Sequence, residues 1–207
     1  MSLVPMRSIL EATEKYNYAQ GAFNVNAVAQ AKAVIEVHEM FRSAAIIQGA
    51  DLANAFMGGR TDFANGTLED KKIGANNIAK AVKKYAENSP IPVALHLDHG
   101  KTVESCVAAM DGGYTSVMID GSSLPFEDNI ALTREVVKLA HARGVTIEGE
   151  LGVLAGVEDH VFAATSTYTN PLDAIRFIKA TGVDALAISY GTKHGANTVS
   201  YTHLTLP

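Results

Sequence analysis

The chain has 207 residues, of which 47% are hydrophobic and 19% are charged, and its formal net charge is −5. This composition is typical of a globular domain with one sizeable core, and it excludes proteins that hold nucleic acid through an excess of basic residues. No apolar run has the length of a membrane-spanning helix, and the N-terminus lacks the apolar centre of a signal peptide. We therefore expect a cytoplasmic protein without membrane contact.

The apolar periodicity predicts six strands that alternate with helices. Ser8 and Glu11 have capping-box spacing, so a first helix is expected to begin at Ser8 and to end before Gly21. A glycine-rich loop is expected at 57–67, before the helix that leads to the third strand. The predicted strands are 22–26, 44–49, 92–98, 116–121, 146–152 and 185–191, and the predicted helices after the first are 27–41, 70–87, 102–112, 126–143 and 171–181.

Continuously apolar strands separated by helices of ten residues or more indicate parallel β/α units covered on both faces. No GxGxxG or GxxxxGK[ST] motif opens a helix, so nothing favours a nucleotide-binding doubly wound sheet. A (β/α)8 TIM barrel usually has eight units in about 250 residues. The expected fold is therefore such a barrel, truncated to about six units over residues 1–198.

The last nine residues, "VSYTHLTLP" at 199–207, do not continue the pattern of units. They resemble the translation of a sequencing-library adapter, and we expect them to be a non-native tail that takes no part in the fold. The single cysteine, Cys106, excludes an internal disulfide, and its helical stretch of small residues favours packing over a nucleophilic role.

Polar side chains gather where the predicted strands end. The carboxyl ends of the strands of a parallel barrel meet at one mouth, so these side chains are expected to converge. Imidazole nitrogens and carboxylate oxygens in such a ring form a ligand set for a divalent metal, best for Zn2+ and acceptable for iron, cobalt or manganese. The polar residues at the strand ends are Asn24, Asn26, Asp98, His99, Asp120, Glu148, Glu150, Lys193 and His194, of which the histidines and carboxylates are the candidate ligands.

Each member of this ring also has a simpler explanation. A lone histidine such as His99 usually has a structural partner, and only a second one at His194 makes a metal site the better interpretation. Strand alternation places His96 on the face opposite His99, as a hydrogen-bonded core residue. Asp120 could instead cap its own loop, "DGSS". The two glutamates of the fifth strand share a face, and both cannot easily be buried with charge unless a cation is present.

Taken together, the motifs at these strand ends resemble those of the class II, metal-dependent fructose-bisphosphate aldolases and the related tagatose-bisphosphate aldolases. The resemblance covers residues 5–198. It is carried by "GAFNVNAV", "LHLDHG", "SVMIDGSSLPFEDNI", "IEGELGVLAGVED", "YTNP" and "SYGTKHG", in that order along the chain.

The resemblance implies a (β/α)8 barrel that assembles into a homodimer or homotetramer. It also implies a zinc ion held by three histidines, of which His99 and His194 occupy matching positions. The third belongs to an "HG(G/A)SG" motif on the seventh strand, which these 207 residues do not contain. Asp120 and Glu150 match positions described for a second or alternative divalent ion.

The resemblance further implies two contacts to substrate. Gly195 matches a backbone position that helps to hold the triose phosphate and a monovalent cation, Na+ or K+, and Asn26 matches an asparagine near the substrate. Ala50 departs from the family pattern, because relatives commonly have a serine there that touches the sugar phosphate.

The implied reaction is reversible aldol cleavage of a ketose 1,6-bisphosphate, fructose 1,6-bisphosphate first, to dihydroxyacetone phosphate and glyceraldehyde 3-phosphate through a metal-stabilised enediolate. Asp98 is assigned to the hydroxyl or aldehyde oxygen. Glu158, in the loop after the fifth strand, is assigned to the carbon-bound proton, with Asp159 as its competitor.

Three alternatives stay open. The substrate could be tagatose 1,6-bisphosphate, which differs only at C4. A class I aldolase would use a Schiff-base lysine, for which Lys193 is the only candidate, although it lies beyond its strand end. The truncated chain could also be an inactive fragment with residual metal binding, because missing units leave strand edges and helix faces uncovered. We expect low or no activity from the 207 residues alone.

Overall fold

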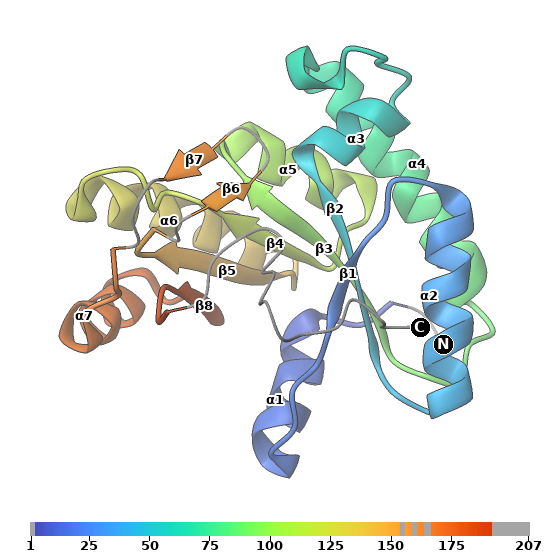
Figure 1. The fold of residues 1–207 in the computed structure, drawn as a ribbon, viewed down its shortest axis with the longest axis horizontal. Helices are drawn as coiled ribbons and strands as arrows, with labels where there is room; N and C mark the ends of the chain where they lie inside the picture. The colour runs from blue at the N-terminus through green and yellow to red at the C-terminus, as the bar shows by residue number, and fades with distance from the viewer. Residues whose placement is uncertain (1–2, 154–155, 159–160, 164–166, 192–207) are drawn as a thin grey trace, which may run out of the picture.

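The computed structural model describes residues 3–153, 156–158, 161–163 and 167–191. Its centre is a six-stranded parallel sheet in the order β1-β2-β3-β4-β5-β8, which forms a half-barrel (Figure 1). The predicted parallel strands in chain order are thereby confirmed. The strands are β1 (Ala22–Asn24), β2 (Ala45–Ala50), β3 (Val93–Gly100), β4 (Ser116–Ile119), β5 (Thr146–Leu151) and β8 (Ala185–Ile188).

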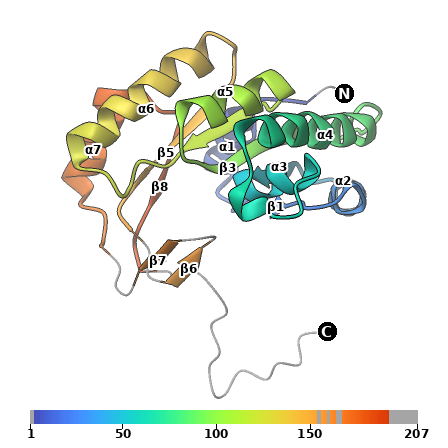
Figure 2. The same cartoon turned by 90° about the horizontal axis from the view of Figure 1, so that it is seen from above.

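Helices cover the convex side of this sheet, and Figure 2 shows α4, α5 and α6 as a layer along it. Alternate strand residues such as Leu95, Leu97 and Val117 point into the main core that these helices bury. The helix bounds agree with the predicted ones to within two residues. The helices are α2 (Val28–Phe41), α4 (Leu68–Ala86), α5 (Val103–Gly112), α6 (Phe126–His141) and α7 (Pro171–Thr181).

The first helix, α1 (Met6–Tyr16), instead packs on the inner side of the half-barrel, near the start of its strands. Met6 and Ile9 form a second, smaller core with Ile46 and Ala94. The helix is fixed from both sides, because Val4 N donates to Val93 O at 2.9 Å and Arg7 N donates to Thr146 Oγ1 at 3.0 Å. The N-terminal end of the half-barrel is therefore closed by α1.

The predicted capping box of this helix is wrong. The helix begins at Met6 with Pro5 at the N-cap, and no side chain caps it. Glu11 does not reach back to Ser8, because its Oε1 accepts from Arg7 Nε at 2.8 Å, one turn away. The spacing fits a cap, but the residues at the start of the helix are instead held by hydrogen bonds from Val4 N to Val93 O of β3 and from Arg7 N to Thr146 Oγ1 of β5.

Two elements were not predicted. Helix α3 (Asp51–Met57) follows β2 directly, and a hairpin of β6 (Gly156–Glu158) and β7 (Val161–Ala163) lies outside the main sheet (Figure 2). Helix α3 packs tightly on α4, where a Cβ added to Gly74 would lie 1.6 Å from Asn54 O. The segment after α3 is irregular and contains a 3-10 turn at Phe63–Asn65.

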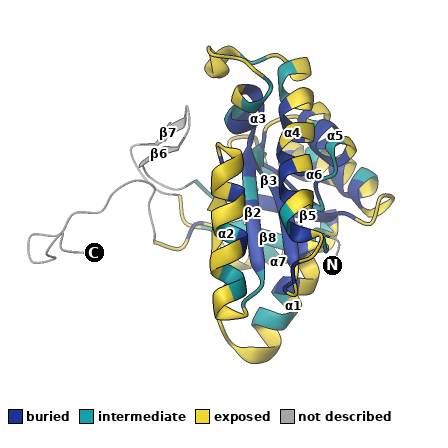
Figure 3. Ribbon diagram, turned by 90° about the vertical axis from the view of Figure 1, so that its right-hand side faces the viewer, coloured by how far each residue is buried: buried dark blue, intermediate teal, exposed yellow. Residues whose placement is uncertain are grey.

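The two outer strands leave apolar side chains in solvent. Phe23 on β1 and Ile188 on β8 are each 43% exposed, and Figure 3 shows the long exposed face of α2 beside the buried sheet. Within the described residues, neither outer edge of the sheet pairs with a further strand. No helix in that part of the chain combines the length and the apolar character that a membrane span requires.

Candidate metal and catalytic site

The inner face of the half-barrel carries the polar side chains. Along β3, Val93, Leu95 and Leu97 join the core, whereas His96 and Asp98 line a cavity of about 230 Å³ on the other face. Residues of β2, β4, β5 and β8 complete this cavity, so the strands bring together side chains that are distant in sequence. The lining also includes Met6, Ala22, Gln48, His99, Met118, Glu148, Glu150 and Ala187.

His99 lines the same cavity because the strand changes direction at this residue. Its φ is 49°, in the left-handed region, and the register of β3 against β4 shifts between Leu97 and Gly100. Such a conformation costs about 1 kcal/mol in a residue with a side chain, and it interrupts the alternation of the strand. As a result, Asp98 and His99 both line the cavity. The prediction that His96 and His99 lie on opposite faces is wrong for the same reason.

Gly100, which follows His99, is needed for close packing. Its own φ is not positive, but a Cβ there would lie 2.8 Å from Met118 O and 2.9 Å from Cys106 Sγ. The motif "LHLDHG" therefore combines a left-handed histidine with a glycine that allows β4 and α5 to approach closely.

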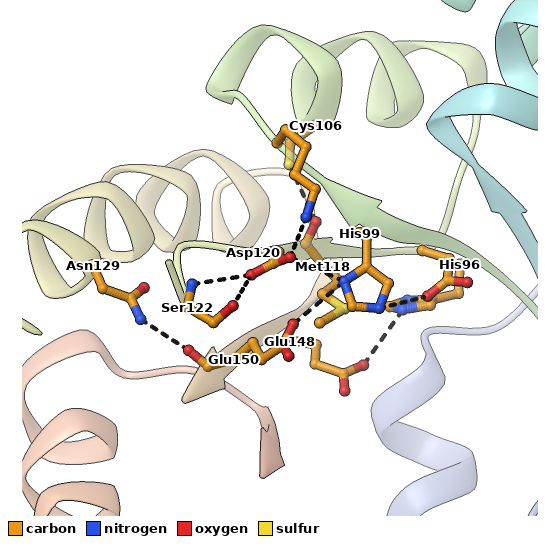
Figure 4. A network of polar contacts seen from close by, with 11 residues as sticks. His96, His99, Cys106, Met118, Asp120, Ser122, Asn129, Glu148 and Glu150 are labelled. Atoms are coloured by element: carbon orange, nitrogen blue, oxygen red, sulfur yellow. Dashed lines mark hydrogen bonds and ion pairs between the residues drawn. The ribbon is translucent and has the colours of Figure 1, made fainter. Parts of the chain in front are cut away.

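His99, Asp120 and Glu150 form a cluster that suits a metal ion (Figure 4). The Nδ1 of His99 lies 3.2 Å from Asp120 Oδ2 and 3.3 Å from Glu150 Oε2. One ligand atom from each residue falls within 4.8 Å of the others. Glu150 Oε2 is buried, and its contact with His99 Nδ1 does not have the geometry of a hydrogen bond. A buried, unsatisfied carboxylate oxygen beside a second carboxylate is an arrangement that a cation stabilises.

Neighbouring groups set the charge of this cluster. Burial raises the pKa of Asp120, but hydrogen bonds from His99, Lys101 and Ser122 outweigh it and hold that pKa well below its usual range. Ser122 N donates to Asp120 Oδ1 at 3.0 Å, so the expected loop cap forms while Oδ2 faces His99. Burial raises the pKa of Glu150, and His99 opposes this shift. The carboxylate of Asp120 therefore stays ionised in this cluster.

A second buried network lies deeper in the cavity. His96 Nδ1 lies 2.8 Å from Ser116 Oγ, and its Nε2 lies 3.4 Å from Glu148 Oε2. Burial lowers the pKa of His96 to about 3 and raises the pKa of Glu148 to about 7. His96 is therefore neutral near pH 7, whereas Glu148 exchanges its proton in that range. His96 is a hydrogen-bonded buried residue, as expected, but it faces the cavity.

Asp98 lies between the metal cluster and strand β1. Its Oδ1 is 3.8 Å from His99 Nε2, and its Oδ2 accepts a hydrogen bond from Asn24 Nδ2 at 3.1 Å. Of the two asparagines at the end of the first predicted strand, Asn26 and not Asn24 was expected to be the site residue. Asn26 is exposed and its backbone N donates to Gln30 Oε1 at 2.6 Å. The signal for Asn24 was its position at the strand end, on the same face as Ala22.

A second cavity, of about 400 Å³, lies at the ends of β1 and β2. Asn24 and Asn26 form part of its wall, so both asparagines lie near the candidate site.

Several predicted site residues fall outside the described part of the chain. His194 and Gly195 lie beyond the described residues, as does Lys193. Glu158 ends strand β6, but its side chain is likewise outside the described part of the structure. The meeting of His99 and His194 at one metal ion therefore stays a prediction.

Comparison with known proteins identifies relatives over nearly the whole chain. The family model described as "Fructose-bisphosphate aldolase class-II" matches residues 4–206, which includes most of the expected tail. Fructose-bisphosphate aldolase of Treponema pallidum is 44% identical over 94% of this chain and 56% of its own length. The Geobacillus stearothermophilus enzyme of that name is 39% identical, over 94% of this chain and 63% of its own length.

Solved structures agree with this result. The YdjI aldolase from Escherichia coli K12 is similar with a TM-score of 0.72 and 32% identity, over 95% of this chain and 64% of that one. The chain therefore spans less than two thirds of each relative. The six-stranded half-barrel corresponds to part of the barrel expected from the sequence. The match of the family model over almost all residues shows that the chain belongs to the class-II fructose-bisphosphate aldolase family.

Proposed function

We propose that the protein to which this chain belongs catalyses the reversible aldol cleavage of a ketose 1,6-bisphosphate, with fructose 1,6-bisphosphate as the first substrate to test. The products would be dihydroxyacetone phosphate and glyceraldehyde 3-phosphate. One observation carries the proposal, namely the convergence of His99, Asp120 and Glu150 beside Asp98 in a member of the class-II aldolase family. Family membership supplies the lyase chemistry, and the geometry supplies groups suited to it.

The described residues fit a divalent ion. One imidazole and two carboxylates converge, and the buried Oε2 of Glu150 contacts the His99 ring but accepts no hydrogen bond. This ligand set suits Zn2+, and His194 would add the second imidazole. Asp120 and Glu150 could also hold a second divalent ion. A divalent ion held here would supply Lewis-acid catalysis at the ketone of the substrate.

General acid/base catalysis would be performed by side chains of this protein. Cleavage between C3 and C4 removes the C4 hydroxyl proton and later returns a proton to carbon on the other fragment, so two groups are needed. Asp98 is suited to the oxygen, because Asn24 orients its Oδ2 while Oδ1 faces His99. We assign the carbon-bound proton to Glu158.

The remaining assignments follow the family resemblance. The backbone of Gly195, together with Na+ or K+, would hold the triose phosphate, and Asn26 would contact the substrate. We further propose a homodimer or homotetramer in the cytoplasm, and that residues 199–207 are a non-native tail that contributes nothing to the site. Tagatose 1,6-bisphosphate is the alternative substrate, because it differs at C4, the carbon whose hydroxyl faces Asp98 in this scheme.

Metal binding and cleavage are tested separately. Titration calorimetry of the metal-free 207-residue chain with Zn2+ should give a saturable site, weakened by roughly 100-fold or more in His99→Ala. His38→Ala is the control, because the His38 ring bonds Val34 O within α2, away from the cavity. Equal Zn2+ affinity in both variants would refute the assigned site.

Cleavage of fructose and tagatose 1,6-bisphosphate, each followed with and without EDTA, then tests the reaction. Loss of activity on borohydride treatment with substrate, and none with EDTA, would favour the Schiff-base lysine over a metal.

A further inference from the structure

Asp120 uses one carboxylate oxygen for its own loop and presents the other to the metal cluster. Oδ1 accepts hydrogen bonds from Ser122 N at 3.0 Å and from Ser122 Oγ at 2.6 Å. Oδ2 faces the ring of His99, whose Nδ1 lies 3.2 Å away (Figure 4). Because both lone pairs of Oδ1 are already used, Oδ2 is the oxygen through which Asp120 would contact a divalent ion.

A cation of the protein already contacts this oxygen. Lys101 Nζ donates to Asp120 Oδ2 and forms an ion pair with it. Asp120 N donates to Gly100 O at 2.9 Å, so the two backbones are joined directly beside Lys101. Among the described lysines and arginines, Lys101 is the one that pairs with the cluster of His99, Asp120 and Glu150. A positive charge at the candidate ligands is therefore supplied by the chain itself.

The cluster needs such a charge when it holds no metal ion. The side chains of Asp120 and Glu150 are 7% and 11% exposed, and both carboxylates contact the same nitrogen of His99. A buried carboxylate is costly unless a cation compensates its charge. The ammonium group of Lys101 offsets part of this cost, because it neutralises the charge of Asp120.

Only the side chain of Lys101 would have to move to leave Asp120. Its backbone is held in place, because the next residue, Thr102, is the N-cap of α5. The Lys101 side chain is 46% exposed, and its flexible four-carbon stem lets the ammonium group turn into solvent. The ion pair of Lys71 with Asp51 differs, since the Lys71 side chain is only 23% exposed.

A divalent ion and an ammonium group compete for Asp120 Oδ2, because two cations at one largely buried oxygen repel each other strongly. We infer that Lys101 is an internal counter-ion of the metal site, which holds Asp120 in the metal-free protein and which a divalent ion has to displace. Lys101 thereby lowers the affinity of the site for metal and sets the metal concentration at which the site fills. The inference rests on the proposed metal-dependent function and adds a residue that regulates metal loading.

Titration calorimetry of the metal-free 207-residue chain with Zn2+ tests the inference. Lys101→Met removes the ammonium group but keeps an unbranched stem, and it should bind Zn2+ about tenfold more tightly than the wild type. Lys101→Arg keeps the positive charge and should stay within about threefold of the wild type.

Lys32→Met is the matched control. It removes the same charge from α2, where Lys32 forms an exposed ion pair with Glu36 at 3.5 Å, and it should change the Zn2+ affinity by less than about twofold.

The outcomes separate the role of Lys101 from the metal site itself. Equal or weaker Zn2+ binding by Lys101→Met would overturn the inference, and so would Lys101→Arg binding as tightly as Lys101→Met. If His99→Ala still weakens Zn2+ binding in that case, the proposed metal site stands and only the role of Lys101 fails. If His99→Ala leaves the Zn2+ affinity of the chain unchanged, the metal site is refuted and the inference falls with it.

Thermal melts give a second, independent measurement. In EDTA, Lys101→Met should melt below the wild type, because Asp120 is left buried without its counter-ion. At one Zn2+ concentration that saturates both proteins, a tenfold higher affinity adds about 1.4 kcal/mol of stability to the variant and should reduce or remove this difference. A deficit that is as large with Zn2+ as with EDTA would show that the ion pair is purely structural, and the inference would then be wrong.

Discussion

Replacing Gly74 by alanine should destabilise the fold, although alanine is the better helix former. The Cβ added at this position would lie 1.6 Å from Asn54 O and 2.5 Å from the carbonyl carbon. Both atoms belong to the backbone of α3, so no side-chain rotation relieves the clash. Restoring a contact of about 3.5 Å requires α3 to move from α4 by roughly 2 Å.

The expected magnitude is a balance of two effects. Alanine in place of glycine within a helix contributes about 1 kcal/mol of stability. Overpacking costs about 1–3 kcal/mol, and a clash with backbone belongs at the upper end. We therefore expect Gly74→Ala to lower the free energy of unfolding by about 2 kcal/mol.

Urea unfolding followed by circular dichroism measures this effect, as a lower midpoint at an unchanged slope. Lys80→Ala is the matched control, because it adds an alanine to the exposed side of the same helix without approaching α3. If Gly74→Ala were as stable as the wild type, or more stable, helix propensity would outweigh the contact. The argument that glycine sets the spacing of α3 and α4 would then fail.

Three further outcomes are expected. Zn2+ at about 100 times its dissociation constant should stabilise the wild-type chain by about 2.7 kcal/mol, and Glu150→Ala should remove this increment in thermal melts; an equal increment in both would exclude Glu150 as a ligand. Burial raises the pKa of the Cys106 thiol far above its usual range, so Ellman's reagent should label this thiol only when the protein unfolds. Fast labelling of the folded protein would contradict the packing around Cys106. Ala50→Ser adds a hydroxyl donor to the wall of the larger cavity and, in condensation with dihydroxyacetone phosphate, should raise kcat/KM for glyceraldehyde 3-phosphate relative to D-glyceraldehyde; an unchanged ratio would show that Ala50 does not control this specificity.

The strands and the ring of polar residues could be predicted because two regularities are local. A buried parallel strand is a continuous apolar run, and its last residues are the first that a ligand can reach. Asp98, His99, Asp120 and Glu150 stand at such ends, and the structure brings all four together.

The features that sequence reasoning missed depend on tertiary contacts. A histidine in a left-handed conformation has no sequence signal comparable to a glycine, so the turn at His99 could not be read from "LHLDHG". The choice between Asn24 and Asn26 depended on which one reaches Asp98 across β2, which the two-residue spacing does not distinguish. Helix α3 was obscured by the glycines that follow it, although Gly58 and Gly74 in fact let it pack closely on α4.

Because α1 closes the N-terminal end of the half-barrel, the protein can be attached to a support at that end. Val4 N donates to Val93 O at the first residue of β3, so residues 3–5 lie at the end of the half-barrel opposite Asp98, which stands near the other end of the same strand. An affinity tag or a linker to a solid support, fused ahead of this helix, should leave the open end unobstructed. Protein immobilised in that way would leave its cavities accessible to ligand in solution. Attachment through Phe56 or Phe63, which line the larger cavity, would obstruct it.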